Sequence, residues 1–255
     1  MNLKQRILVA LLTCSLATNV TLLQAQSNTL DDVHLFQIFH RDASFTVGPY
    51  IESGFNYDNF TKYFRMANFA VQAGYGLTSK FEVGGTVSFL DLDPKLGDRH
   101  SGVSDLMLTV KHRIFSGATK FALGALVILP TGTDKVRQGR TNLGAYFALR
   151  HPFPSGIVTT ANIGAISGRD MILDHVEVRL ALSGAVIVPA SRKLALVGEF
   201  DYQNEIDYQI FTAGLDYRLA PGSRLRAGVG SNFGIGNGAP EISFGLRLLQ
   251  VFAHP

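Results

Sequence analysis

The sequence is poor in cysteine and contains no tryptophan. Cys14 is the single cysteine, and it falls within a predicted leader, so the chain left after cleavage has no disulfide, thiol nucleophile or cysteine metal site. No stretch of about 20 apolar residues follows Ala25, which excludes a bundle of membrane-spanning helices. An exported chain without cross-links must therefore be stabilised by its fold alone.

The sequence also lacks a strong net charge and recognisable catalytic motifs. The formal net charge is +3, and no basic run or aromatic-basic platform indicates nucleic-acid binding. There is no Gly-x-Ser-x-Gly elbow, no HExxH motif and no ligand spacing among the seven histidines. The glycine-rich stretch 228–238 lacks the strand-to-helix context of a nucleotide loop. These absences argue against an enzyme and predict neither a cofactor nor a metal.

Residues 1–25 have the pattern of a secretory signal peptide. Lys4 and Arg6 form a basic start, residues 7–17 form a short apolar core, and Ala25 offers a small residue for cleavage. The alternative is an uncleaved anchor, but the apolar core is shorter than a membrane-spanning helix requires. Removal of the two basic residues lowers the net charge of the mature chain from +3 to +1.

The stretch 101–132 shows the clearest structural pattern, two strands joined by a tight turn. Asp105, Met107, Thr109, Lys111 and Arg113 alternate with Leu106, Leu108, Val110, His112 and Ile114. This period of two is typical of a strand with one apolar and one polar face. Residues 116–119 supply the turn, and 120–129 form the second strand. Strands of about ten residues have the length that crosses a bilayer at a tilt.

Similar segments fill the remainder of the chain. Twelve are predicted, at 44–57, 62–77, 81–92, 103–115, 120–130, 141–152, 156–167, 175–188, 193–203, 206–219, 224–234 and 240–252. Ten or fourteen strands remain as alternatives. Short connections alternate with longer ones, notably 93–102 and 132–140. Outer-membrane barrels have short periplasmic turns and longer outer loops, so both termini are expected in the periplasm.

These features favour an all-β fold, a transmembrane antiparallel up-and-down barrel of about 12 strands. A bilayer offers no water to backbone groups, so strands can span it only when closed into a barrel. A soluble sandwich is the alternative, with the charged face exposed to solvent. Strand length, alternating loops and aromatic residues near strand ends favour the barrel. The predicted organisation is a signal peptide at 1–25, a periplasmic segment or partial plug at 26–43, and the barrel at 44–255.

If the apolar positions face lipid, the opposite positions line the interior. The charged candidates for lumen-lining residues are Glu52, Glu82, Asp105, Lys111, Arg113, Arg150, Glu177, Arg179, Glu199, Asp201, Asp216, Arg218, Arg226 and Arg247. One hypothesis is a polar pathway whose charges select a solute. The other is a filled interior in which these groups pair across strands and only stabilise the barrel.

Part of the chain resembles a known family. The runs Gly102-Val103-Ser104-Asp105-Leu106 and Lys111-His112-Arg113-Ile114-Phe115 resemble its "G-x-x-D-hydrophobic … K-Y-R-aromatic" strand, with His112 in place of the usual tyrosine. Leu129-Pro130-Thr131-Gly132 and Asn162-Ile163-Gly164 resemble its "L-P-T-G" and "N-x-G" elements. This is the outer-membrane barrel family of the meta-pathway of phenol degradation. The resemblance implies a transporter that passes hydrophobic or aromatic compounds.

The sequence therefore predicts a passive channel in the outer membrane of a Gram-negative bacterium. Expected partners are outer-membrane lipid, a small solute, and the barrel insertion machinery, which would read the last strand ending at Phe252. Two alternatives stay open: a structural or adhesive barrel that acts through its outer loops, and a lipid-modifying outer-membrane enzyme.

Overall fold

The computed structural model describes residues 33–37, 40–60, 63–136, 139–169, 176–204, 208–234 and 238–252. The predicted signal peptide and residues 26–32 lie outside these ranges. The strands are β1 (Gly48–Phe60), β2 (Phe64–Thr78), β3 (Phe81–Pro94), β4 (His100–Val103), β5 (Leu106–Ser116), β6 (Lys120–Leu129), β7 (Asn142–Pro152), β8 (Val158–Arg169), β9 (Val176–Pro189), β10 (Leu194–Gln203), β11 (Tyr208–Ala220), β12 (Ser223–Ser231) and β13 (Ile242–Val251). None of the described residues lies in a helix long and apolar enough to cross a membrane.

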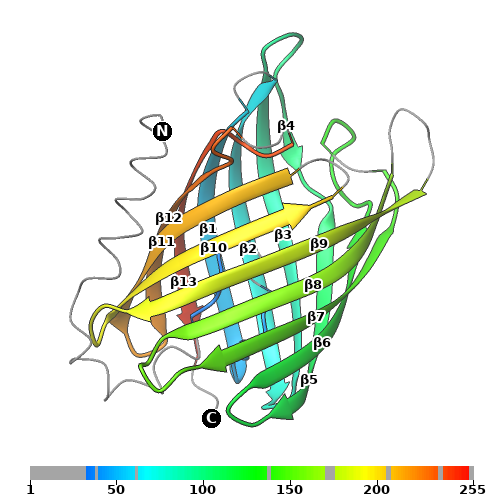
Figure 1. The fold of residues 1–255 in the computed structure, drawn as a ribbon. Coiled ribbons are helices and arrows are strands. Elements are labelled where there is room, and N and C mark those ends of the chain that lie inside the picture. The colour runs from blue at the N-terminus through cyan, green and yellow to red at the C-terminus, as the bar shows by residue number, and fades with distance from the viewer. Residues whose placement is uncertain are drawn as a thin grey trace.

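The strands form one closed antiparallel barrel (Figure 1). Closure comes from β1, which pairs with β2 on one side and with β13 on the other. The thirteen elements occupy twelve positions because β4 and β5 both pair with β3, one after the other. The twelve-stranded up-and-down barrel predicted from the sequence is confirmed.

The segment predicted at 103–115 is interrupted near its start. β4 ends at Val103 and β5 begins at Leu106. At the break, the Ser104 hydroxyl accepts a hydrogen bond from the backbone N–H of Ser88 at 2.9 Å. The carboxylate of Asp105 accepts another from the N–H of Gly132 at 2.9 Å. These side-chain bonds add to the backbone bond from the N–H of Ser104 to the carbonyl of Ser88, at 2.7 Å, between the two strands.

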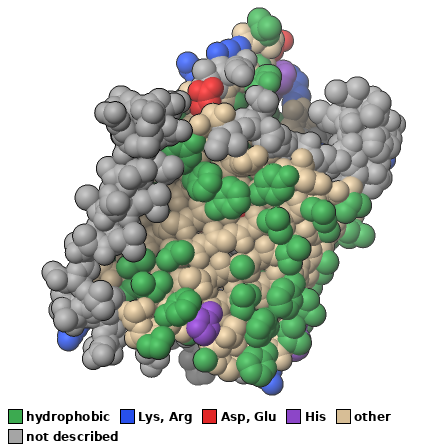
Figure 2. Space-filling view, viewed as in Figure 1, with side chains coloured by type: hydrophobic (Ala, Val, Ile, Leu, Met, Phe, Trp, Pro, Cys, Tyr) green, Lys and Arg blue, Asp and Glu red, His purple; other side chains and the backbone are tan. Residues whose placement is uncertain are grey.

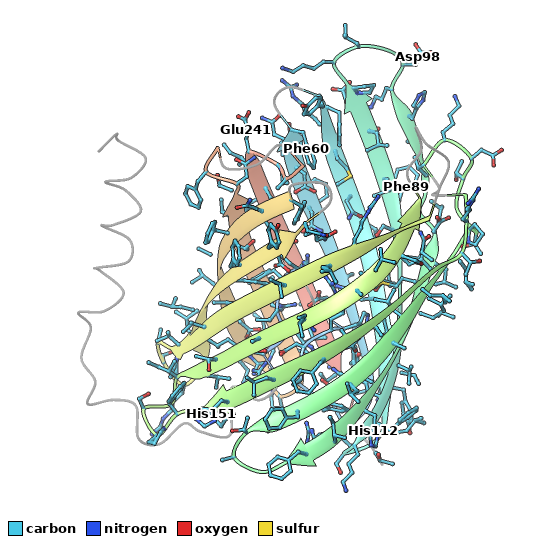
Figure 3. The ribbon with its side chains drawn as sticks, turned by 45° about the vertical axis from the view of Figure 1, so that its right-hand side comes forward. Phe60, Phe89, Asp98, His112, His151 and Glu241 are labelled. Atoms are coloured by element: carbon cyan, nitrogen blue, oxygen red, sulfur yellow. The ribbon has the colours of Figure 1, made fainter. Side chains whose placement is uncertain are left out.

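The two ends of the barrel differ. At the short-turn end, the connections β2–β3, β5–β6, β7–β8, β9–β10 and β11–β12 have two to five residues. In the turn between β11 and β12, Gly222 has a φ of +75°, which a type II turn requires after Pro221. The long-loop end carries the wider connections, and Asp98 and Glu241 lie there, opposite His112 and His151 (Figure 3).

The outer wall is apolar and the inner wall is polar. Outward positions of the strands expose large side chains such as Leu143, Ile163, Val178 and Leu182. On the face shown in Figure 2, hydrophobic side chains cover the strands, and charged side chains gather mainly at the ends. A soluble protein does not leave such a band uncovered, whereas a bilayer covers it. The alternation seen in the sequence is thus the alternation between outside and inside.

Candidate functional site in the barrel interior

Most of the predicted lumen residues are buried inside the barrel. Nine are at most 9% exposed: Glu52, Glu82, Asp105, Lys111, Arg150, Glu199, Asp201, Asp216 and Arg226. Arg113, Arg179, Arg218 and Arg247 are partly buried, and the side chain of Glu177 lies outside the described residues. The inward face of the wall is therefore strongly charged, as the strand pattern indicates.

The interior is not empty, because residues 33–37 and 40–46, here called the inner segment, lie within it. Val33, His34, Leu35, Asp42 and Ala43 are each 0% exposed. The sequence predicts a strand from residue 44, but β1 begins only at Gly48. Ser44 and Thr46 bond with the inward side chains of Lys111 and Glu82, and β1 begins only at Gly48, so the predicted start of the first strand is wrong by four residues.

Wall carboxylates hold the inner segment by its backbone. The two oxygens of Glu199 accept the N–H groups of Phe36 and Gln37, at 2.8 and 3.0 Å. Glu82 accepts the N–H of Thr46 at 3.1 Å. Because charged acceptors form hydrogen bonds about twice as strong as neutral ones, these contacts anchor the segment at two separate strands, β10 and β3.

Wall cations hold the inner segment in the complementary way. Lys111 donates to the carbonyl of Ser44 at 2.5 Å, and Arg226 donates to the carbonyl of His34. Arg150 forms an ion pair with Asp42, and both side chains are 0% exposed. A buried carboxylate and guanidinium are tolerated only as such a hydrogen-bonded pair.

The wall cations are themselves paired with wall acids. Arg226 contacts Glu52 at 2.5 Å and Asp216 at 3.5 Å, and Arg247 contacts Glu52 at 3.5 Å. Lys111 pairs with Glu82 at 3.2 Å, and Arg224 pairs with Asp216. The guanidinium of Arg226 also lies 4.7 Å from the ring centre of Phe36. Pairs that are distant in the chain thus share one network around the inner segment.

Two histidines of the inner segment, His34 and His40, are buried next to hydroxyl groups. His34 bonds with the hydroxyls of Thr46 and Ser44, at 3.0 and 3.3 Å. Burial, and then the charge of Lys111, lowers the pKa of His34 well below its usual value and that of His40 to about 3. Both imidazoles are therefore neutral at physiological pH.

Glycines in the wall make room for large inward side chains. A Cβ at Gly124 would overlap the ring of Tyr146, whose hydroxyl donates to the carbonyl of His40 at 2.8 Å. A Cβ at Gly214 would overlap the ring of Phe36. These glycines are the signal in the sequence that could have indicated a filler inside the barrel, since a wall facing only water needs no such gaps.

The sequence did not indicate that individual polar residues of the inner segment contact the charged wall. Asp42, His34, Ser44 and Thr46 contribute as much to the network as wall residues do. They lie outside the alternating pattern, which identifies only residues on strands. Nothing local in residues 33–47 specifies which wall charges they meet.

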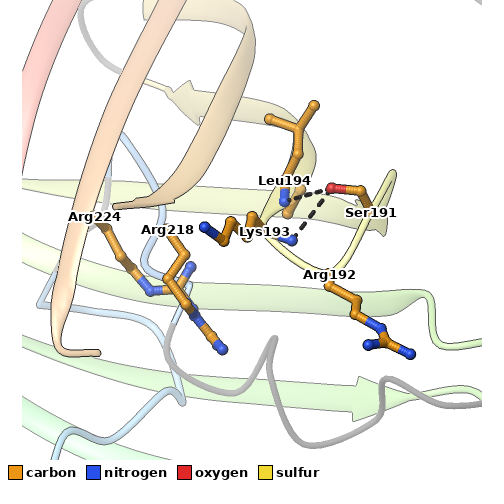
Figure 4. A pocket seen from close by; sticks show the side chains of 7 residues that line it. Ser191, Arg192, Lys193, Leu194, Arg218 and Arg224 are labelled. Atoms are coloured by element: carbon orange, nitrogen blue, oxygen red, sulfur yellow. Dashed lines mark hydrogen bonds between the residues drawn. The ribbon is translucent and has the colours of Figure 1, made fainter. Parts of the chain in front are cut away.

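A shallow hollow lies at the short-turn end and adjoins this network at Arg224 (Figure 4). It is lined by the turn Ser191–Leu194 together with Arg218 and Arg224. The hydroxyl of Ser191 accepts the N–H groups of Lys193 and Leu194, at 3.2 and 3.1 Å, which closes the turn. The hollow is basic and belongs to the rim. Among the described residues, no cluster of histidine, cysteine and acidic side chains is suited to a metal ion.

The fold is shared with outer-membrane channels and porins. No protein-family model matches the sequence, and a search of curated proteins gives no significant match. An outer-membrane channel from Pseudomonas putida F1 has a similar structure, with a TM-score of 0.62 and 15% identity, over 84% of this chain and 98% of that one. The KdgM porin gives 0.57 and 10%, over 80% and 99%. The NanC porin gives 0.53 and 11%, over 80% and 100%. At these identities the likeness establishes the fold of an outer-membrane β-barrel.

Proposed function

We propose that this protein is a passive outer-membrane channel for a small solute, and that movement of the inner segment sets its opening. One observation carries the proposal. The barrel is filled by a segment separate from the strands, which is attached through ion pairs and hydrogen bonds and also packs Val33, Leu35 and Phe36 against inward apolar residues of β8, β9 and β10. Polar contacts can be exchanged for water, so such a filler can move while the strand ladder stays intact.

The solute is proposed to be small and to carry polar groups. The resemblance to the phenol-degradation family favours a hydrophobic or aromatic compound. The inward face instead presents carboxylates, guanidinium groups and hydroxyls, which favour a solute able to hydrogen-bond. A compound with a small apolar body and a polar group meets both conditions. Swelling of proteoliposomes in phenol-sized solutes of different polarity would rank these classes.

The second candidate is a barrel with a permanently filled interior that acts through its long-loop end. The extensive pairing of Arg226, Glu52 and Asp216 supports it, because such networks also stabilise a closed wall. A lipid-modifying enzyme has less support, since the similar structures are channels and porins. Contact with outer-membrane lipid, and with insertion machinery through Phe252, belongs to the proposal as well.

A reversible disulfide between the inner segment and the wall would distinguish the two candidate functions. Ala43 of the inner segment and Ala122 of β6 lie in one buried cluster, and each is 0% exposed. With cysteines at both positions, oxidation should lock the inner segment and suppress conductance in a planar bilayer, and reduction should restore it. Ala43→Cys alone is the control and should not respond. Equal conductance of the oxidised and reduced double variant, or none in any state, would contradict a channel gated by this segment.

A further inference from the structure

The carboxylates of Glu199 and Asp201 differ from four other buried acids in the barrel interior. Glu52, Glu82, Asp42 and Asp216 each form an ion pair with an arginine or lysine. Glu199 and Asp201 are 3% and 5% exposed. Of the lysines and arginines in the described ranges, none lies within 4.0 Å of either carboxylate.

The pair lies on one face of β10. Two residues apart on a strand, both side chains point into the barrel, and both are buried there. Arg41 and Arg247 are the cations that act on them from a greater distance, the first on Asp201 and the second on Glu199. Two buried carboxylates side by side are costly to ionise unless a cation joins them.

A second, independent observation comes from the neighbouring strands. Ser183 on β9 is the cross-strand partner of both Asp201 and Asn162. Its hydroxyl donates to one oxygen of Asp201 at 2.5 Å, while the other oxygen, Oδ2, has no hydrogen-bond partner. Asn162 is 4% exposed and donates to the carbonyl of Arg41 at 2.7 Å, yet its Oδ1 has no partner. Two buried acceptors thus flank Ser183 with no donor.

We infer that Glu199, Asp201 and Asn162 form a site in the lumen for a small protonated primary amine. A primary ammonium has three N–H donors and one positive charge, which match two unused acceptors and an acidic pair that has no described lysine or arginine within 4.0 Å. Because no metal-type cluster is found among the described residues, an organic cation fits these groups better than a metal ion does. The amine would be the polar group of the transported solute.

The idea that this amine belongs to the transported solute rests on the proposed channel function. Binding of the amine is therefore measured in an assay that does not involve transport. The purified full chain in detergent is unfolded thermally in methylammonium chloride and, at equal ionic strength, in tetramethylammonium chloride. Tetramethylammonium has the same charge but no N–H donor. Ligand binding to the folded state raises the unfolding midpoint. We expect a higher midpoint in methylammonium for the native chain, and loss of this difference in Asp201→Asn and Asn162→Leu.

Asp98→Asn is the matched control, because it removes one negative charge from the exposed long-loop end (Figure 3). It should retain the full methylammonium effect. Equal unfolding midpoints in the two salts for the native chain, or an unchanged effect in Asp201→Asn, would overturn the amine site. The acidic pair would then be explained by a proton shared between its carboxyl groups. A methylammonium effect without conductance in bilayers would instead retain the site and refute the channel.

Discussion

Removing the buried partner of Asp42 should release the inner segment from the wall. Arg150 and Asp42 are both 0% exposed and form an ion pair between β7 and the inner segment. Arg150→Gln leaves the Asp42 carboxylate buried with two remaining donors, the hydroxyl of Thr160 at 2.5 Å and the N–H of Ala43 at 2.7 Å. Removing one partner of a buried pair costs about 3–5 kcal/mol. Because two donors remain, we expect the lower end, about 3 kcal/mol.

That loss is large enough to measure as proteolysis. Since each 1.4 kcal/mol is a factor of ten, the released population should rise about 100-fold. Trypsin cuts after arginine, and Arg41 becomes a substrate only when the inner segment leaves the interior. When opening and closing are fast, cleavage follows the open population. Cleavage after Arg41, identified by intact mass, should therefore accelerate about 100-fold in Arg150→Gln.

The control variant is Arg99→Gln, which removes an arginine from the exposed pair with Asp91 at the long-loop end. It should leave cleavage after Arg41 unchanged, because exposed pairs contribute little. The decisive outcome is the rate in Arg150→Gln. If that rate stays within threefold of the native one while the barrel unfolds more easily, the inner segment is an integral part of the wall and the reasoning fails.

Further predictions concern the outer wall, acidity and the fit of the filler. Leu182→Arg places a charge on the lipid face of β9 and should lower the unfolding free energy in lipid by about 2–4 kcal/mol, against a smaller loss in Leu182→Ala. His34 and His40 have lowered pKa values in the docked segment, so docking is strongest above about pH 6.5 and weakens by up to tenfold per pH unit for each histidine as pH falls below that value, down to about pH 3 for His40. The measurement is hydrogen exchange of the inner segment, corrected for its intrinsic pH dependence. Protection that does not change with pH would contradict the predicted weakening of docking. Gly124→Val should displace the ring of Tyr146 and speed release in the protease assay by about tenfold, whereas Gly198→Val, where an added Cβ meets nothing within 4 Å, should leave release unchanged.

The wall could be predicted because lipid and lumen impose opposite demands on alternate residues. In β9, Leu180 and Leu182 face outward, and Ala181 and Ser183 face inward, as the period of two indicates. The ends of most strands fall within a few residues of the prediction for the same reason. Apolar alternation alone misleads at residues 44–47, where Phe45 and Val47 imitate a strand that has no neighbour to pair with.

The pairing inside the barrel could not be predicted, because it depends on closure. Glu52 and Arg226 are 174 residues apart and meet only since β13 pairs with both β1 and β12. The alternating pattern marks each residue as inward without saying which inward neighbour it has. Likewise, Phe36 and Gln37 reach Glu199 through backbone groups, which carry no signal in the sequence.

The distribution of anchors around the wall suggests how a filled barrel can still conduct. Residues 33–37 are attached to β10 and β12 through Glu199 and Arg226, whereas residues 40–46 are attached to β3, β5 and β7. The two halves of the inner segment thus hold separate arcs of the barrel, linked by the contacts of His34 with Thr46 and Ser44. One half can leave its arc while the other stays anchored, which costs only part of the docking energy. The proposed amine site lies beside the first half, at the carboxylate that holds Phe36 and Gln37. A cation that competes for Glu199 would therefore weaken that anchor, so binding of the solute and opening of the channel would be coupled at one residue.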